Sequence, residues 1–253
     1  MKIGNIKAVF FDFGGVVTKR CTSPPLEKVV VKYLKRLGIK VPDSIYRAIK
    51  KSFSTGIRLS LSTLIEIRIE EYFKQALRTL NLYPQRSLIN DFVRFFYNEI
   101  TCEIRVEVYD IIRSIKRMHI LTGIISNSFS NFPRFFLKKK KLASMFDVIV
   151  LSRDIQRRKP HPDIFMYAVR KLGVNPNESL FVGDIYEVDV FGAKSVGMIA
   201  VLMITPEAWS EWKELVKKYT PKPSVLPKPD YVIHALNEVL EIIEEIRSPS
   251  SRL

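Results

Sequence analysis

The amino-acid sequence predicts an α/β protein that has a parallel sheet covered by helices on both faces and an inserted bundle of α-helices. Short apolar runs alternate with helical patterns from about residue 106 onward. Such alternation is typical of a parallel sheet between two layers of helices. Residues from about 24 to 101 show helical periodicity only, which indicates a helical unit inserted between strands. A hydrophobic content of 47% in 253 residues is enough to form a large core.

The first strand is predicted at residues 7–13, where a continuous apolar run, Ala8-Val9-Phe10-Phe11, ends in Asp12. A run of this kind is typical of a strand that is buried on both faces. Four helices are predicted next, because prolines, a glycine and serines stand at the positions where helices usually begin and end. They span Pro24-Pro25 to Leu37, Pro42 to about Ser54, Ser60 or Ser62 to Leu80, and Gln85 to Ile100.

The second half of the chain is predicted to supply the rest of the sheet and its covering helices. Short apolar runs indicate strands, and apolar residues that recur every three or four positions indicate helices. The predicted strands are Ile120–Ser126, Phe146–Leu151, Ser179–Gly183, Met198–Met203 and Tyr231–Ile233. The predicted helices are Glu107–Met118, Asn131–Lys140, Asp163–Leu172, Tyr186–Val196, one from Pro206, and a final one after the Pro-rich loop at 221–229.

The composition indicates which classes of binding partner and which cellular location to expect for the protein. A formal net charge of +15 is compatible with nucleic acid, an anionic membrane surface or an anionic substrate, but a solvated basic surface is favoured. The sequence lacks nucleic-acid motifs of the usual spacings, so we expect no nucleic-acid partner. It also lacks an apolar run of roughly 18 residues and the features of a signal peptide. We therefore expect no membrane association and a cytoplasmic location.

The two cysteines, Cys21 and Cys102, are too few for a disulfide scaffold or a structural zinc site. They lie near the predicted entry and exit of the helical insertion, where the two linkers must run side by side. We therefore expect them to be close in space. A disulfide needs Cα atoms within about 7 Å of one another, and the sequence leaves open whether the two residues are bonded.

Polar side chains follow three of the predicted strands at the point where each strand ends. Asp12 follows the first strand, Ser126 and Asn127 end another, and Asp184 follows a third, with Asp189 five residues later. In open parallel sheets, ligands bind beyond these carboxyl ends of the strands. Each residue alone is compatible with a helix cap or a solvated strand end. Together they are expected to converge on one rim of one sheet.

Carboxylates, a hydroxyl, backbone amides and a lysine form a coherent chemical set at such a rim. Carboxylate oxygens suit Mg²⁺, which takes one or two carboxylates together with a phosphate. The hydroxyl, the amides and Lys159, which precedes Pro160, suit the other oxygens of that phosphate. Asp12 is then a candidate nucleophile that forms an aspartyl-phosphate, while the metal offsets the repulsion between two anions.

Four motifs in order resemble those of haloacid dehalogenase superfamily hydrolases, in the subfamily with a helical cap inserted after the first motif. The motifs are FFDFGGVV, ILTGIISN, RRKPHPDIF and LFVGDIYEVDVFGAKSVGM. The resemblance implies a Rossmann-like three-layer core, formed by residues 1–18 and 106–253, and an α-helical cap domain at 19–105. It also implies Mg²⁺ as cofactor and a small phosphorylated substrate, and we expect a monomer or a homodimer.

The resemblance also implies a role for each site residue. Asp12 corresponds to the nucleophile and a metal ligand, and Lys159 to the cation that stabilises the charge of Asp12 and of the phosphoryl group. The remaining expectations are a metal-binding carbonyl at Gly14, phosphate binding by Ser126 and Asn127, a direct metal ligand at Asp184, and at Asp189 either a water-mediated metal ligand or a partner of Lys159.

One departure from the family pattern bears on the chemistry. Gly14 stands where phosphatases of this kind usually carry a second Asp, which protonates the leaving alcohol. Proton transfer of this kind is typically worth about 10²–10⁴ in rate. Val16, Ile185 and Val188 also differ from the usual pattern, in a way expected of packing variation. The sequence therefore leaves open a 2-haloacid dehalogenase, a phosphonate hydrolase of the same superfamily, or a non-catalytic regulatory or binding protein.

Overall fold

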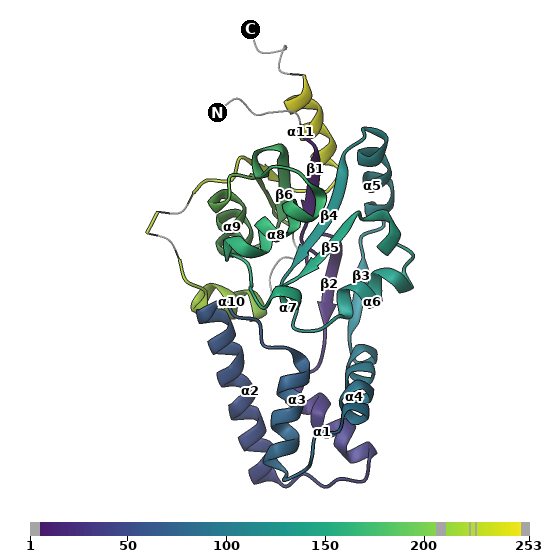
Figure 1. Ribbon diagram of the computed structural model, residues 1–253, viewed down its shortest axis with the longest axis vertical. Coiled ribbons are helices and arrows are strands. Elements are labelled where there is room, and N and C mark those ends of the chain that lie inside the picture. The colour runs from purple at the N-terminus through teal and green to yellow at the C-terminus, as the bar shows by residue number, and fades with distance from the viewer. Residues whose placement is uncertain (1–5, 206–210, 223, 226, 249–253) are drawn as a thin grey trace.

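The computed structural model describes residues 6–205, 211–222, 224, 225 and 227–248, and its core is a six-stranded parallel sheet (Figure 1). The strand order is β5-β4-β1-β6-β7-β8. The strands are β1 (Ala8–Phe11), β4 (Leu121–Ser126), β5 (Val148–Leu151), β6 (Ser179–Gly183), β7 (Ile199–Met203) and β8 (Tyr231–Ile233). Phe11 pairs with Ile124 on one side and Val182 on the other, so three successive carboxyl ends lie at one edge of the sheet. The predicted α/β fold class is confirmed.

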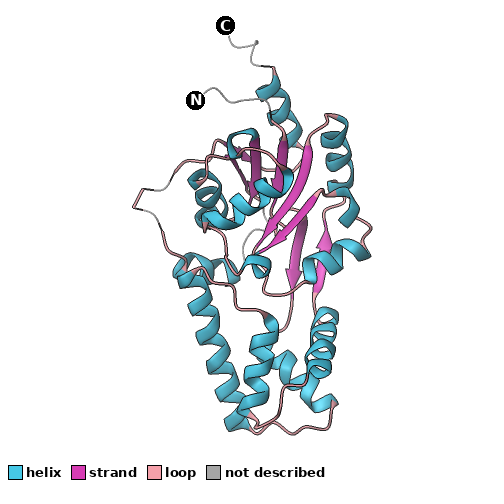
Figure 2. Cartoon of the chain, in the orientation of Figure 1, coloured by secondary structure: helices cyan, strands magenta, loops and turns pink. Residues whose placement is uncertain are grey.

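Helices cover both faces of the sheet. Successive side chains of a strand point to opposite faces, so each strand contributes to an apolar cluster on either side. Val9 and Phe11 of β1 belong to one apolar cluster, and Ala8 and Phe10 belong to another. The first cluster contains side chains of α5 (Val108–Arg117), α6 (Phe132–Lys139) and α11 (Glu238–Arg247). The second contains side chains of α8 (Pro162–Leu172) and α9 (Phe191–Ser195). The result is a three-layer arrangement (Figure 2).

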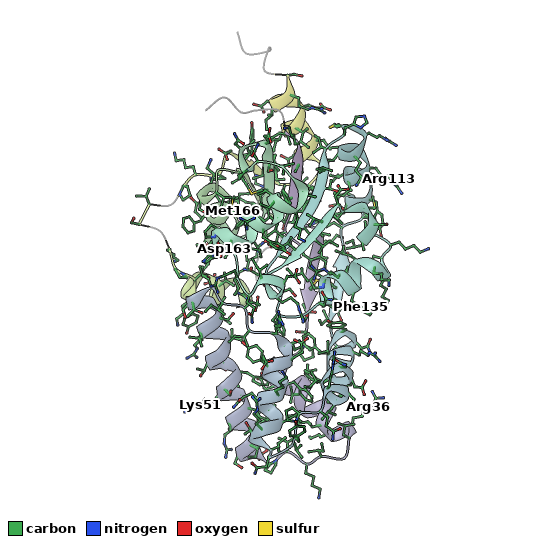
Figure 3. All side chains as sticks on the ribbon, viewed as in Figure 1. Arg36, Lys51, Arg113, Phe135, Asp163 and Met166 are labelled. Atoms are coloured by element: carbon green, nitrogen blue, oxygen red, sulfur yellow. A yellow bond between two sulfur atoms is a disulfide. The ribbon has the colours of Figure 1, made fainter. Side chains whose placement is uncertain are left out.

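The helical insertion consists of four helices that share an apolar core of their own. They are α1 (Leu26–Arg36), α2 (Asp43–Thr63), α3 (Ile69–Thr79) and α4 (Arg86–Asn98). Phe73 and Phe92 stack at the centre with 3.9 Å between ring centroids. Basic side chains such as Arg36 and Lys51 lie on the outside of the insertion (Figure 3), as a solvated basic surface requires.

A two-stranded antiparallel ribbon connects the sheet to the insertion. It is formed by β2 (Thr18–Thr22) and β3 (Thr101–Ile104), which were not predicted as strands. Cys21 and Cys102 are register partners in it, with Cα atoms 4.1 Å apart, and a disulfide joins them. Their predicted proximity is confirmed. The predicted division into 1–18 with 106–253 and 19–105 falls at the ends of this ribbon and stays a prediction.

The predicted boundary between the second and third helices is wrong. The second helix continues to Thr63 instead of ending near Ser54, and the third begins at Ile69. Ser60 donates its hydroxyl to the carbonyl oxygen of Ile65 at 2.6 Å, and so closes the end of α2 instead of capping the start of another helix. Leu64 follows in the left-handed conformation, which ends α2.

Several shorter elements complete the chain. The predicted helix Tyr186–Val196 begins as a π-helical turn, η3 (Tyr186–Val190), and continues as α9. The predicted start at Pro206 lies outside the described residues, and α10 (Glu211–Tyr219) follows it. The others are η1 (Ala143–Met145), α7 (Ser152–Ile155) and η2 (Pro176–Glu178). Among the described helices, none combines the length and the apolar character that a membrane span requires.

Candidate active site

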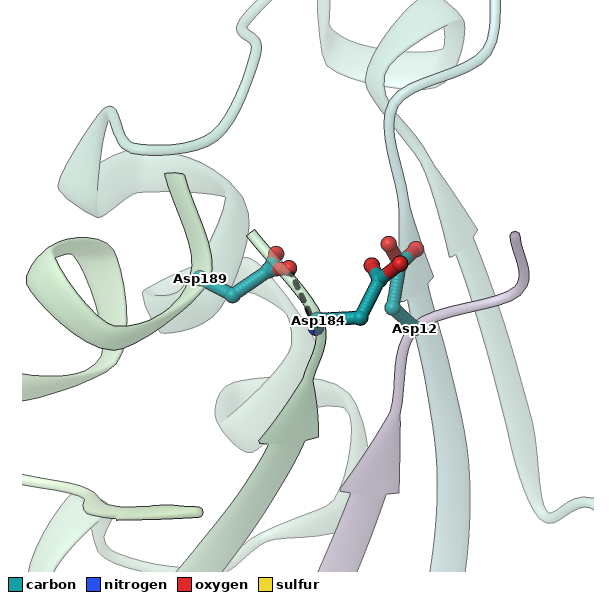
Figure 4. Close-up of side chains that lie close together, drawn as sticks. All are labelled: Asp12, Asp184 and Asp189. Atoms are coloured by element: carbon teal, nitrogen blue, oxygen red, sulfur yellow. Dashed lines mark hydrogen bonds between the residues drawn. The ribbon is translucent and has the colours of Figure 1, made fainter. Parts of the chain in front are cut away.

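Three carboxylates lie together at the carboxyl ends of β1 and β6 (Figure 4). Asp12 follows β1, Asp184 follows β6, and Asp189 belongs to the π-helical turn η3. One oxygen of each residue lies within 4.8 Å of the corresponding oxygens of the other two. Asp12 is fixed by its backbone, because its N–H donates to the carbonyl of Val182 and its Oδ1 accepts from the N–H of Phe13.

Lys159 bridges two of these carboxylates from the loop that precedes α8. Its Nζ lies 3.0 Å from Oδ1 of Asp12 and 2.7 Å from Oδ1 of Asp189, and its side chain is 1% exposed. Burial disfavours the charged form of Lys159, but the charges of Asp12 and Asp189 outweigh this effect and raise its pKa. Lys159 therefore stays an ammonium at neutral pH, within contact of Asp12.

Asp189 uses both of its oxygens for contacts within the protein. Oδ1 pairs with Lys159, and Oδ2 accepts the backbone N–H groups of Asp184 and Ile185 at 3.0 and 2.9 Å. The side chain therefore holds the loop that carries Asp184 and positions Lys159 at the same time. Two roles were expected for Asp189, a water-mediated metal ligand or a partner of Lys159. These contacts favour the second role.

The two glycines after Asp12 differ in what they permit. Gly15 has φ of +84°, and a Cβ there would collide with the carboxylate of Asp184, so only glycine allows this close approach. A Cβ on Gly14 would meet no atom within 4 Å among the described residues, and its φ lies outside the left-handed region. A Cβ is therefore accommodated at Gly14 without backbone strain.

Ser126 ends β4, the strand next to β1, and Asn127 is the residue that follows it. Ser126 is buried at 4% exposure. The side-chain amide of Asn127 donates to the carbonyl of Lys159 at 3.0 Å, and its Oδ1 accepts the N–H of Lys159 at 2.7 Å. This reciprocal pair fixes the loop after β4 against the residue that contacts Asp12. The sequence motif pointed only to the backbone amide of Asn127 and gave no sign of this function of its side chain.

Burial is the largest influence on the protonation of Asp12 and Asp184. It raises the pKa of Asp12 to about 7, an effect that Lys159 opposes and that Asp189 and Asp184 reinforce. It also raises the pKa of Asp184 to about 6, with Asp189 reinforcing the shift and Lys213 opposing it. A divalent cation in contact with both carboxylates would favour their charged forms.

The donor set fits a hard divalent cation. Oδ1 of Asp184 is buried and has no hydrogen-bond partner in the part of the chain that the structure describes. It is therefore free to bind a metal, and the oxygen ligands gathered here are those that Mg²⁺ prefers. Asp12 and Asp184 are the carboxylates that would hold it, and the carbonyl of Gly14 stays a predicted ligand.

Lys213 is a contact of the site that could not be found from the sequence. It lies on α10, and its Nζ is 2.5 Å from Oδ2 of Asp184, with the two side chains 14% and 2% exposed. No motif marks this residue, because α10 lies outside the four motifs and its sequence shows only a basic helix. The contact arises because α10 packs against the turn η3, which follows Asp184.

Known proteins match this chain along most of its length. The profile of the haloacid dehalogenase-like hydrolases matches residues 6–197, and a HAD-hydrolase-like profile matches residues 156–239. The chain is 28% identical over 242 residues to pyrophosphatase PpaX of Bacillus cereus (strain B4264), covering 95% of this chain and 98% of that protein. It is 29% identical over 140 residues to pyrophosphatase PpaX of Bacillus mycoides (strain KBAB4), a match that spans only 55% of this chain and 59% of that protein.

Solved structures share the fold. A HAD phosphatase from Thermococcus onnurineus superposes with a TM-score of 0.58 at 24% identity, covering 94% of this chain and 98% of that one. A 2-haloacid dehalogenase from Pseudomonas syringae pv. Tomato DC3000 superposes with a TM-score of 0.67 at 18% identity, covering 95% and 99%. Because a phosphatase and a dehalogenase both share this architecture, the fold does not choose between the two chemistries.

Proposed function

Because the chain belongs to the haloacid dehalogenase-like hydrolase family, we propose that it is a Mg²⁺-dependent phosphomonoester hydrolase acting on a small phosphorylated metabolite. The observation that carries the proposal is the contact of Lys159 with Asp12, beside a buried Asp184 that keeps one oxygen unpartnered among the described residues. A nucleophilic carboxylate, a fixed ammonium and a second carboxylate ligand are what phosphoryl transfer to Asp12 requires.

In the proposed reaction, Asp12 attacks phosphorus, a bond forms between its carboxylate oxygen and phosphorus, and the bond from phosphorus to the leaving oxygen breaks. Lys159 compensates the negative charge on Asp12 and the phosphoryl oxygens. The hydroxyl of Ser126 and the backbone N–H of Asn127 donate to those oxygens and orient the group. Bound Mg²⁺ would supply positive charge that stabilises the transferring phosphoryl group. Water then attacks phosphorus, the bond from phosphorus to the oxygen of Asp12 breaks, and inorganic phosphate leaves, so that the carboxylate of Asp12 is restored.

Gly14 restricts the leaving group, because it supplies no acid that protonates the departing oxygen. Substrates whose leaving group departs readily as an anion are therefore favoured. Phosphoanhydrides belong to this class, since their leaving group is itself a phosphate. Relatives named pyrophosphatase make hydrolysis of a phosphoanhydride the second candidate function.

A separate observation weighs against each of the three alternatives, which are a dehalogenase, a phosphonate hydrolase and a non-catalytic protein. Dehalogenases of the superfamily work without a metal, so they do not need a cation-binding carboxylate such as Asp184. A phosphonate hydrolase would need a reactive lysine on the inserted helices, and no lysine described there is distinguished by its surroundings. A non-catalytic protein would have no need to keep Lys159 fully buried between two carboxylates.

A phosphate-release assay with and without Mg²⁺ tests the proposal. We expect the wild-type protein to hydrolyse an aryl phosphate with Mg²⁺ and to lose this activity in EDTA. Asp12→Asn keeps the size of the side chain but removes the nucleophile, and it should lower the rate at least about 10³-fold. The matched control is Asp110→Asn, a surface aspartate that is 83% exposed. Hydrolysis by Asp12→Asn at the wild-type rate, or release of chloride from 2-chloropropionate, would contradict the assignment.

A further inference from the structure

Helix α10 contacts both the helical insertion and the segment that follows β6 (Figure 1). Val216 of α10 packs in one apolar cluster with Leu61 of α2 and Val188 of the turn η3. On the neighbouring turn, the guanidinium of Arg58 on α2 lies over the ring of Tyr219, 5.7 Å from its centroid. Lys213 lies three residues before Val216, which places both side chains on the same face of α10. One face of α10 therefore contacts the insertion and the candidate metal site together.

Lys213 contacts Asp184 twice. Its Nζ lies 2.5 Å from Oδ2 and donates to the backbone carbonyl oxygen of the same residue at 3.3 Å. Both side chains are largely buried, so the pair is shielded from solvent ions. Asp184 is thus bound through Oδ2 to a cation that the chain itself supplies, while its Oδ1 has no hydrogen-bond partner among the described residues. Lys213 and a metal on Oδ1 would therefore oppose one another through their charges and not by sharing one oxygen.

The charges around the site show what this contact does to a metal. Asp12, Asp184 and Asp189 supply three negative charges when ionised, while Lys159 and Lys213 supply two positive ones. A divalent cation next to Lys159 alone would neutralise the three carboxylates. With Lys213 in contact as well, the same cation meets a second positive charge beside Asp184 in a buried site, which is unfavourable.

We propose that Lys213 is a tethered cation that competes with the divalent cation for Asp184, so that metal binding displaces Lys213 and loosens α10 from the core. The inference rests on the proposed role of Asp184 as a metal ligand. Because α10 also packs against α2, displacement of Lys213 couples metal binding to the contact between the core and the helical insertion.

The first test measures Mg²⁺ affinity by calorimetry in wild type and Lys213→Met. Removal of the competing charge should tighten Mg²⁺ binding by about 10-fold or more. Lys213→Arg keeps the charge and should stay near the wild-type affinity. Lys217→Met, which removes an exposed lysine from the same helix, is the matched control and should also bind like wild type. Melting of each variant checks that it folds, and Lys213→Gln replaces Lys213→Met if the latter does not.

A second readout follows α10 itself. The two tryptophans of the chain are Trp209 and Trp212, so intrinsic fluorescence reports on α10 and the residues just before it. Saturating Mg²⁺ should change this fluorescence in wild type and should change it much less in Lys213→Met, where the contact is already lost.

The outcomes separate this inference from the proposed cofactor. If Lys213 instead orients Asp184 for the metal, Lys213→Met should bind Mg²⁺ about 10–100-fold more weakly, as loss of an outer-shell partner does. Weaker or unchanged affinity in Lys213→Met, with normal binding by wild type, would overturn the inference alone. Absence of Mg²⁺ binding in wild type and Lys213→Met would overturn both the cofactor and the inference.

Discussion

Glu66 of the inserted helical segment and Arg158 of the core form an ion pair in which the two side chains are only 2% and 6% exposed. Nη1 of Arg158 and the hydroxyl of Ser152 both donate to Oε2 of Glu66 at 2.5 Å. Arg158 is the residue before Lys159, so the insertion is joined to the core directly beside the cation that contacts Asp12. A buried pair of this kind ties the position of the insertion to that of the loop that carries Lys159.

Removal of one partner of this pair should destabilise the protein strongly. Glu66→Ala leaves Arg158 as an uncompensated buried charge, which costs about 3–5 kcal/mol. The free energy of unfolding in urea measures the effect. Glu71→Ala, which breaks an exposed pair with Lys74 on α3, is the control and should cost about 1 kcal/mol or less. Equal and small losses in the two variants would show that the buried pair does not hold the insertion.

The disulfide between Cys21 and Cys102 should stabilise the folded chain against unfolding. It joins residues 81 positions apart, so it removes many conformations from the unfolded state. The double variant Cys21→Ser/Cys102→Ser should lose about 2–4 kcal/mol of unfolding free energy under non-reducing conditions. In excess reductant the wild type and the variant should become equal. A difference that persists in reductant would assign the loss to packing of the serines instead.

The raised pKa of Asp12 predicts how stability changes with pH. Its pKa is about 7 in the folded protein, above the ordinary value of 3.8, so the folded state holds the proton more tightly than the unfolded state. The stabilisation from this group is complete below pH about 4 and is lost as pH rises through 7. Asp12→Asn should not lose stability in this way, because an asparagine side chain does not titrate.

Melting temperatures in EDTA at pH 5 and pH 8 measure the effect. From pH 5 to pH 8, the melting temperature of wild type should fall relative to that of Asp12→Asn. Asp110→Asn should follow wild type. Saturating Mg²⁺ should restore the wild type at pH 8, because a ligand that binds only the folded state stabilises it. A constant difference between wild type and Asp12→Asn at both pH values would contradict the raised pKa.

Gly14 predicts a preference among leaving groups. Aryl phosphates should be hydrolysed measurably and alkyl phosphates poorly, because an alkoxide needs a proton that Gly14 cannot give. Gly14→Asp should raise kcat/KM for the alkyl substrate by up to about 10²-fold, and raise it less for the aryl substrate. The open space around a Cβ at this position, and its ordinary φ, permit the substitution.

Gly15→Asp is the matched control for this substitution. It should disrupt the site, because its Cβ would collide with Asp184. Equal wild-type efficiency on the aryl and alkyl substrates would mean that another group supplies the proton.

Much of the fold and several candidate site residues could be predicted from the sequence, because they depend on local patterns and on one general rule of sheet geometry. The apolar run before Asp12 identified β1, and the run before Asp184 identified β6. Since neighbouring parallel strands end at the same edge, the sequence alone was enough to expect these two carboxylates together. The serines at 60 and 62 misled the helix assignment, because their hydroxyls bind carbonyls as readily as they cap a helix.

Contacts between distant segments were decided only by the tertiary structure. Glu66 and Arg158 are 92 residues apart, and Lys213 follows Asp184 by 29 residues on a helix outside the motifs. Neither pair has a local signature, because an ion pair depends on how two finished elements dock. The sequence by itself therefore determined which strands form the parallel sheet and which carboxylates follow them. Docking of the insertion and of α10 decided which cations those carboxylates meet, since burial and charge act through space and not along the chain.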